Sequence, residues 1–192
     1  MIDLSPVFRR EKTLAEIGAP ITKQDLIAFT NEILDTQRAI IAEATDADVV
    51  FVPVDPQAND ANAAPGTEVQ QAWTLGHVVV HATAGSEEGA ATALTLARSV
   101  QVEGRSRYET PWERVTSVAQ VVQRYEESRK MRLAMLDAWP EQPDLANSYT
   151  PTEVFGPMNA VARFLLGLAH EQSHLEQLRE IMRQAKQARG AN

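Results

Sequence analysis

The sequence predicts an all-α protein folded as a four-helix bundle. Apolar residues recur at helical spacing over four long stretches, and Ser or Thr residues stand before most of these stretches as candidate N-caps. Segments with the alternation typical of strands are scarce, and the sequence has no internal repeat. Four long helices without a repeat are typical of a bundle. We therefore expect residues 1–192 to form one domain, with a core bundle over residues 22–186.

The first long helix is predicted to begin after Thr22. Asp25 follows at the position where a capping box places its acidic partner, and an apolar line then runs to Ile40. A shorter helix is expected before it, starting at Ser5-Pro6 and ending near Gly18, because proline suits the first turn of a helix and glycine its end.

The second long helix is predicted from its N-cap Thr74 to about Ser99. Small residues make this helix narrow on several sides, which allows close approach of a neighbouring helix or a ligand. They are Gly76, Ala82, Ala84, Gly85, Gly89 and Ala90.

The third and fourth long helices occupy the second half of the chain. Thr116 or Ser117 caps the third, which ends before Pro140. The fourth follows Gly156-Pro157 and is expected to continue to about Lys186. Residues 161–169 are apolar on nearly all sides, which is typical of a central, buried helix.

Three other segments interrupt the helical pattern. Val49–Val52 is short and β-branched, and we expect it to be extended. Residues 55–66, rich in Asp, Asn, Ala and Pro, are expected to form a loop. Residues 101–115 contain Gly104, Pro111 and several charges, and are expected to form a longer connection.

Composition excludes several classes of function. The formal net charge of −8 argues against a nucleic-acid surface, because phosphate binding needs clustered Lys and Arg. No apolar run approaches the roughly 20 residues of a membrane span, and the first residues lack the features of a signal peptide. The absence of cysteine excludes disulfides and thiolate ligands. We expect a cytoplasmic protein without nucleic-acid or membrane partners.

The histidines carry the main signal for function. All four fall into two i, i+4 pairs, His77 with His81 and His170 with His174. Residues at this spacing stack on one helix face, so two facing helices could aim imidazoles at one point. Such an arrangement would bind a metal ion, because neutral imidazole is a common ligand for zinc, nickel, iron and copper. The simpler alternative to a metal site is that these helical histidines lie on a solvated face or form hydrogen bonds within the core.

Four histidines leave the kind of metal site open. Three protein ligands plus water would give a reactive site, whereas four would close a structural one. A purely structural bundle that binds no metal is also consistent with these residues.

Two segments resemble those of a known superfamily. Trp73–His81 resembles the start of the second helix in the DinB/YfiT-like superfamily, and His170–Gln177 resembles its fourth-helix motif, in which HxxxH is followed by Gln. The resemblance implies an up-down-down-up bundle with a long crossover, commonly as a homodimer. It also implies a zinc or nickel ion held by the triad His81, His170 and His174.

The activity expected from this resemblance is metal-dependent chemistry on a small-molecule substrate. Some relatives transfer a low-molecular-weight thiol, so thiol S-transfer is preferred to hydrolysis; a non-catalytic metal-binding stress protein is the alternative. Catalytic roles are predicted for Glu171 and His77, the latter also being a candidate fourth ligand or a packed residue. Candidate groups that support the imidazoles are Glu171, Glu88 and Gln177, with an ordinary solvated side chain as the alternative for each. Trp73 is a candidate pocket wall or core anchor.

Residues His170–His174 also match HExxH, the zinc-peptidase motif whose glutamate is the general base. We discount this interpretation, because no downstream third ligand follows and the upstream histidines come with a bundle signature instead.

Overall fold

Helices make up the regular structure of the described part of the chain. The computed structural model describes residues 3, 5–58, 70–103, 111–151 and 155–190. No strand occurs among these residues, although Tyr149 and Met158 form an isolated antiparallel bridge. The predicted all-α class is confirmed. Within the described residues, no helix is both long and apolar enough to cross a membrane.

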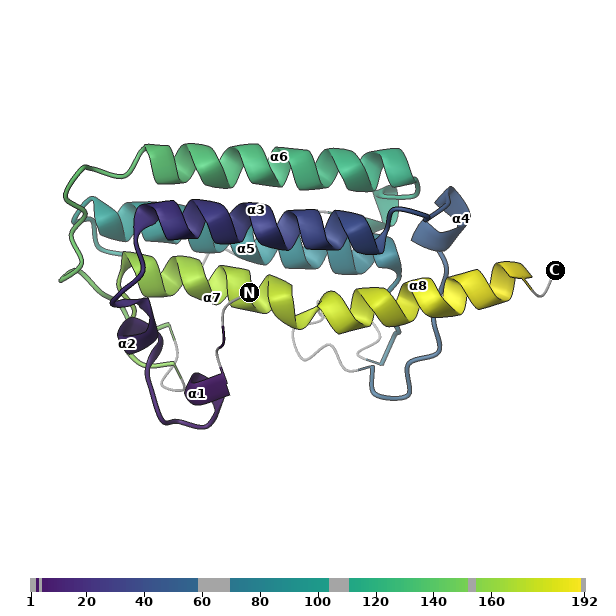
Figure 1. Ribbon diagram of the computed structural model, residues 1–192, viewed down its shortest axis with the longest axis horizontal. Helices are drawn as coiled ribbons and strands as arrows, with labels where there is room; N and C mark the ends of the chain where they lie inside the picture. The colour runs from purple at the N-terminus through teal and green to yellow at the C-terminus, as the bar shows by residue number, and fades with distance from the viewer. Residues whose placement is uncertain (1–2, 4, 59–69, 104–110, 152–154, 191–192) are drawn as a thin grey trace.

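Four long helical segments lie side by side in Figure 1. They are α3 (Lys23–Ile40), α5 (Leu75–Ala97), α6 (Val118–Asp137), and α7 (Ala160–Ser173) with its continuation α8 (Leu175–Gly190). The colour order along the chain shows α3 and α7 running in one direction and α5 and α6 in the other (Figure 1). Helix α5 packs against α6 and α7, and α3 packs against the same two helices.

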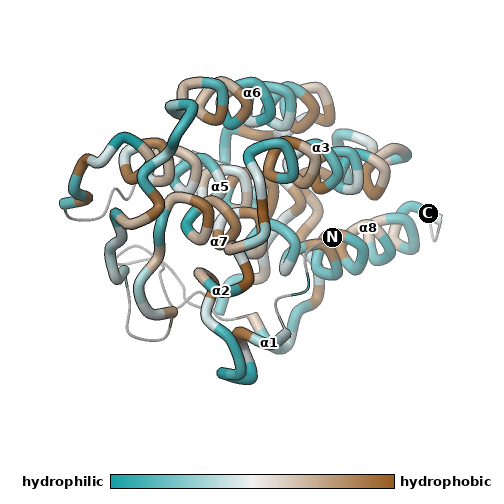
Figure 2. The backbone as a smooth tube through the Cα atoms, turned by 60° about the vertical axis from the view of Figure 1, so that its left-hand side comes forward, coloured by the Kyte–Doolittle hydropathy of each residue, from teal (hydrophilic) through white to brown (hydrophobic). Residues whose placement is uncertain are grey.

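The core lies between these helices. Each long helix carries hydrophobic and hydrophilic residues around its axis (Figure 2), and the hydrophobic ones face the other helices. Burying them removes apolar surface from water, which is the main force that holds the helices together. Fully buried side chains come from every long helix; they include Leu34, Val78, Leu96, Val121, Leu136, Phe164, Leu165 and Leu178.

The predicted N-caps determine where the long helices begin. Thr22 and Asp25 form a capping box, in which the Asp25 amide donates to Thr22 Oγ1 over 3.2 Å and the Thr22 amide donates to Asp25 Oδ2 over 2.9 Å. Thr74 caps α5 by accepting from the His77 amide over 3.2 Å. Of the two candidates for α6, Ser117 is the cap. Asn159, rather than the Gly156-Pro157 turn, caps α7.

The N-terminal helix differs from the prediction. The single helix expected between Ser5 and Gly18 is divided into α1 (Ser5–Phe8) and α2 (Leu14–Gly18). Arg10 between them has a φ of 59°, a left-handed conformation that cannot continue a helix. Thr13 and Glu16 then form a new capping box at the start of α2.

The prediction of an extended segment at Val49–Val52 is wrong for its first residue, Val49. Val49 ends the short helix α4 (Asp46–Val49). The Thr45 amide donates to Asp48 Oδ2 over 2.7 Å, and this local cap outweighs the strand preference of Val49. The next residues have no regular structure. The loop predicted at 55–66 lies largely outside the described residues. The predicted connection 101–115 ends in the 3₁₀ helix η1 (Trp112–Arg114). Residues 104–110 of this connection lie outside the described residues.

The fourth helix is broken where one continuous helix was predicted. His174 separates α7 from α8, and its amide donates to the carbonyl of Glu171, a 3₁₀-type bond, over 3.2 Å. The Ser173 hydroxyl donates to the carbonyl of His170 over 2.6 Å, a side-chain bond that competes with the helix ladder and bends helices. The chain therefore bends at one of the predicted metal ligands.

Candidate metal centre

A close approach of α5 and α7 brings the two histidine pairs together. A Cβ added at Gly167 would lie 3.1 Å from Ser86 Cα, and one added at Gly85 would lie 2.8 Å from His170 Nδ1. The two glycines therefore have different tasks. Gly85 leaves room beside the imidazole of His170, while Gly167 lets the backbones of α5 and α7 approach.

Three imidazoles meet at this crossing. His81 Nε2 lies 3.0 Å from His170 Nε2, and His174 Nε2 lies 3.3 Å from the same atom. The three side chains are partly buried, and each offers a ring nitrogen within 4.8 Å of the others. Among the described residues, these histidines form the group suited to hold a metal ion. His77 is not a member of the group.

The spacing of the nitrogens matches a coordination sphere. Two imidazole nitrogens that each lie about 2.1 Å from one ion, at angles between octahedral and tetrahedral, are about 3.0–3.4 Å apart. Both nitrogen–nitrogen distances at His170 fall in this range. His170 Nε2 lies within hydrogen-bond distance of two other imidazole nitrogens, yet each neutral imidazole carries a single N–H, so the three nitrogens cannot all be paired as donor and acceptor. A cation at their centre resolves this conflict, so the donor set fits a divalent metal.

Gln177 sets the tautomer of His174. Its Oε1 lies 2.8 Å from His174 Nδ1. Because an amide oxygen only accepts hydrogen bonds, Nδ1 carries the proton and Nε2 presents its lone pair to the other histidines. This is the usual way in which an outer group orients a metal-binding imidazole. The sequence-based prediction of Gln177 as a supporting group therefore has a structural basis.

The environment keeps the imidazoles of His170 and His174 neutral. Burial, together with the neighbouring His174 and His81, lowers the pKa of His170 from 6.5 to about 3. Burial also lowers the pKa of His174, against the opposing effects of the Gln177 hydrogen bond and the Glu171 charge. Neutral imidazole is the form that ligates metals, so the site is prepared for a cation at neutral pH.

An aromatic stack covers one side of the histidines. The ring of His77 lies between Trp73 and Trp112, with centroid distances of 4.4 Å on both sides. Trp73 also lies 4.5 Å from the His81 ring and 5.9 Å from the His174 ring. Trp73 thus forms a wall beside the group of three, and His77 supports that wall from behind.

Glu171 points into the core of the bundle. Its side chain has no solvent exposure, and its Oε2 accepts hydrogen bonds from Arg132 Nη1 over 2.6 Å and from the Ser86 hydroxyl over 3.0 Å. Arg132 is equally buried. The carboxylate predicted to be catalytic is therefore engaged in an ion pair inside the bundle, although it lies between two of the histidines in the sequence.

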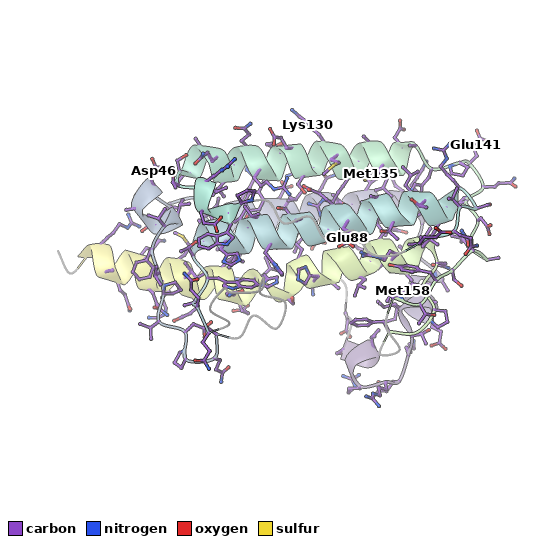
Figure 3. The ribbon with its side chains drawn as sticks, turned by 180° about the vertical axis from the view of Figure 1, so that it is seen from behind. Asp46, Glu88, Lys130, Met135, Glu141 and Met158 are labelled. Carbon is purple, nitrogen blue, oxygen red and sulfur yellow. The ribbon has the colours of Figure 1, made fainter. Side chains whose placement is uncertain are left out.

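The remaining candidate, Glu88, lies farther along α5 (Figure 3). It is two turns from His81, about 10 Å by helix rise. It is not in the group suited to a metal.

Two residues that complete the site were not predicted from sequence. Trp112 lies in the connection before α6, where no pattern indicated a contact with His77. Arg132 had a signal, because it follows Tyr125 by two helical turns and so continues the buried line of α6. A charged residue on an apolar line requires a buried partner, which Glu171 provides.

Replacing Gly85 by alanine tests the space beside His170. We expect the new methyl group to displace the imidazole and to weaken metal affinity about ten- to hundred-fold, the range found when groups that orient a ligand are altered. Alanine is the better helix former by about 1 kcal/mol, so the helix should persist. Titration against a chromogenic chelator measures the affinity. Gly190→Ala is the matched control, since nothing lies within 4 Å of a Cβ there; equal affinities in both variants would contradict the assignment.

The lowered pKa of His170 predicts how the metal-free protein responds to acid. Because the folded-state pKa of about 3 lies below the ordinary 6.5, the unfolded chain binds the proton first as the pH falls. The stability contribution is complete above pH 6.5 and is lost as the pH falls toward 3. Urea unfolding with chelator present at pH 7, 6 and 5 should therefore show a steeper loss for the wild type than for His170→Gln. Parallel losses would show that His170 does not carry the effect.

Comparison with known proteins gives a family match. The family model described as the DinB superfamily matches residues 12–178, which include all three histidines of the group. No curated protein and no solved structure gives a significant match to the chain.

Proposed function

Because the chain belongs to the DinB superfamily, we propose that His81, His170 and His174 hold one zinc or nickel ion that serves a reaction on a small molecule. The observation that carries this proposal is the convergence of three Nε2 atoms, with separations of 3.0 and 3.3 Å at His170. The opposed directions of α3 and α7 against α5 and α6 support the up-down-down-up topology of the family (Figure 1). The homodimer implied by the resemblance stays a prediction.

Thiol S-transfer is the reaction that we prefer, with hydrolysis as its alternative. A divalent ion held by three imidazoles lowers the pKa of a thiol or water that coordinates it, which supplies a nucleophile near neutral pH. The preferred substrate is a low-molecular-weight thiol together with an electrophile. This preference rests on membership of the superfamily and not on a contact in the structure.

The protein's own residues prepare the site for this chemistry. Gln177 holds His174 in the tautomer that faces the other imidazoles, and Gly85 keeps space for His170. Trp73 covers the His81 and His174 rings and reduces access of bulk water on that side. A drier surrounding strengthens the electrostatic interactions inside the site.

The two residues predicted to be catalytic have contacts that favour supporting roles. His77 is stacked between two indoles, which suits a residue that positions Trp73. Glu171 is paired with Arg132 without solvent exposure, so its carboxylate is not placed as a general base for an incoming water. This contact further weakens the HExxH peptidase interpretation. The catalytic roles themselves stay predictions.

Elemental analysis tests the proposal directly. Protein purified without a histidine tag should contain about one metal per chain, and His81→Ala and His170→Ala should each lose it. The metal-free and reloaded forms should then be compared with thiols plus an electrophile, and with esters. Metal-dependent consumption of a thiol supports S-transfer, and ester cleavage supports hydrolysis. Metal without turnover would favour the non-catalytic stress protein, and no metal after reloading would contradict the site.

His77→Phe decides whether His77 is a fourth ligand. Phenylalanine preserves a flat ring between Trp73 and Trp112 but has no nitrogen for a metal. We expect unchanged metal content and affinity in this variant, and weaker binding in His77→Ala, where Trp73 loses its support. Loss of the metal in His77→Phe would instead indicate a closed four-ligand site.

A further inference from the structure

A set of unpartnered polar atoms lies deep in the bundle behind the histidines. They belong to side chains of α3, α6 and α7 that are at most 1% exposed. None of these atoms has a hydrogen-bond partner among the described residues. They are Gln37 Nε2 and Oε1, Tyr125 Oη, Ser128 Oγ, Arg132 Nη2 and Glu171 Oε1. Buried polar atoms of folded proteins are nearly always paired, so this concentration needs an explanation.

Two ion pairs between α3 and α6 show which residues of the two helices lie level with one another along the bundle axis. Arg38 pairs with Glu126 and Arg129 pairs with Asp35, both over 2.6 Å. Gln37 lies between the α3 partners of these pairs but is fully buried, so it faces the interior at the height of residues 125–129 of α6.

The polar residues of α6 share one face. Tyr125, Ser128 and Arg132 follow the i, i+3, i+7 spacing that places side chains along one line. Arg132 Nη1 reaches Glu171 Oε2 over 2.6 Å. Burial, and next to it the charge of Glu171, raises the pKa of Tyr125 well above its ordinary value, so the hydroxyl is protonated and lies near the carboxylate. The unpartnered atoms therefore belong to buried side chains of α3, α6 and α7 that face the interior of the bundle.

The chemistry of these atoms selects a neutral occupant that both donates and accepts. Arg132 Nη2 and Gln37 Nε2 only donate, Glu171 Oε1 and Gln37 Oε1 only accept, and the two hydroxyls do either. The arginine and glutamate charges cancel, so neither a cation nor an anion is needed. Buried water typically makes about three hydrogen bonds to such groups.

We propose that ordered water molecules occupy the interior between Gln37, Tyr125, Ser128, Arg132 and Glu171, and that this hydrated network positions His170 and His174. Glu171 connects the two functions, because it lies directly after His170 and its carbonyl accepts the His174 amide at the break between α7 and α8. Holding its carboxylate from α5 and α6 fixes the rotation of α7 and so the direction of both imidazoles. Arg132 and Glu171 are thus positioning residues for the metal centre.

The first experiment locates the water and does not depend on metal. A crystal structure of the wild type, at a resolution that shows ordered solvent, should contain water bonded to Tyr125 Oη and Glu171 Oε1. Tyr125→Phe keeps the ring and removes the hydroxyl, so its structure should lose or shift that water. A dry interior in which the six atoms bond directly to one another would overturn the proposal.

The second experiment tests positioning, and it alone rests on the proposed metal site. Glu171→Gln keeps the shape of the side chain but removes the charge that holds Arg132. We expect zinc affinity, measured by chelator competition, to fall about ten- to hundred-fold. Lys130→Ala is the control, since Lys130 is exposed on the outer side of α6 (Figure 3) and should bind as the wild type does. If the ordered water is present but the zinc affinity of Glu171→Gln equals that of the wild type, the positioning role is overturned. A wild type that binds no zinc would instead contradict the proposed function and leave the water result standing.

Discussion

Adding zinc or nickel to the metal-free wild type is expected to raise its melting temperature, and His170→Ala is expected to remove most of that rise. An ion that binds only the folded state stabilises it by about 2.7 kcal/mol when its free concentration is about 100 times Kd. For a domain of this size, each kcal/mol corresponds to about 2–4 °C. The rise should therefore be roughly 5–10 °C.

His170 is the residue to replace because its Nε2 is the atom shared by both short nitrogen contacts. Its removal leaves His81 and His174 without the nitrogen that lies next to each of them. The melting temperature of each variant should be compared with and without metal, so that any effect of the substitution on the metal-free fold is subtracted. An equal metal-induced rise in wild type and His170→Ala would contradict the three-histidine site.

Replacing Arg132 alone by methionine is expected to destabilise the fold by about 3–5 kcal/mol, because the Glu171 carboxylate would be left buried without its counter-charge. Replacing both residues by methionine should recover most of this loss, since a well-packed apolar pair removes the unpaired charge. Urea unfolding of the wild type, both single variants and the double variant measures the coupling between them. Additive losses would show that the pair does not act as a unit.

The same double variant separates stability from positioning. If Arg132 and Glu171 only hold the fold together, the stable double variant should bind zinc as the wild type does. If they direct His170 and His174 through the rotation of α7, its affinity should stay low even though its stability recovers. A pair near the surface offers a comparison, because Arg38 and Glu126 are partly exposed and their replacement should change stability by at most about 1 kcal/mol.

Much of the fold was predictable because its signals are local. The caps Thr22, Thr74 and Ser117 begin their helices where the sequence indicated, since a cap depends on the few residues that follow it. The same applies to the histidine pairs, whose i, i+4 spacing follows from helix geometry alone. The break at His174 was missed because Ser173 favours it through a side-chain bond that apolar periodicity does not reveal.

The residue types and spacing of the three histidines, and the helices that carry them, are determined by the sequence itself. What only the tertiary structure decided is which groups meet between helices: Gly85 against the His170 ring, Trp112 against His77, and Arg132 against Glu171. The physical reason is that backbone geometry sets distances within a helix, one residue after another. Contacts between helices depend instead on how closely and at what rotation whole helices pack, and that follows from the core as a unit.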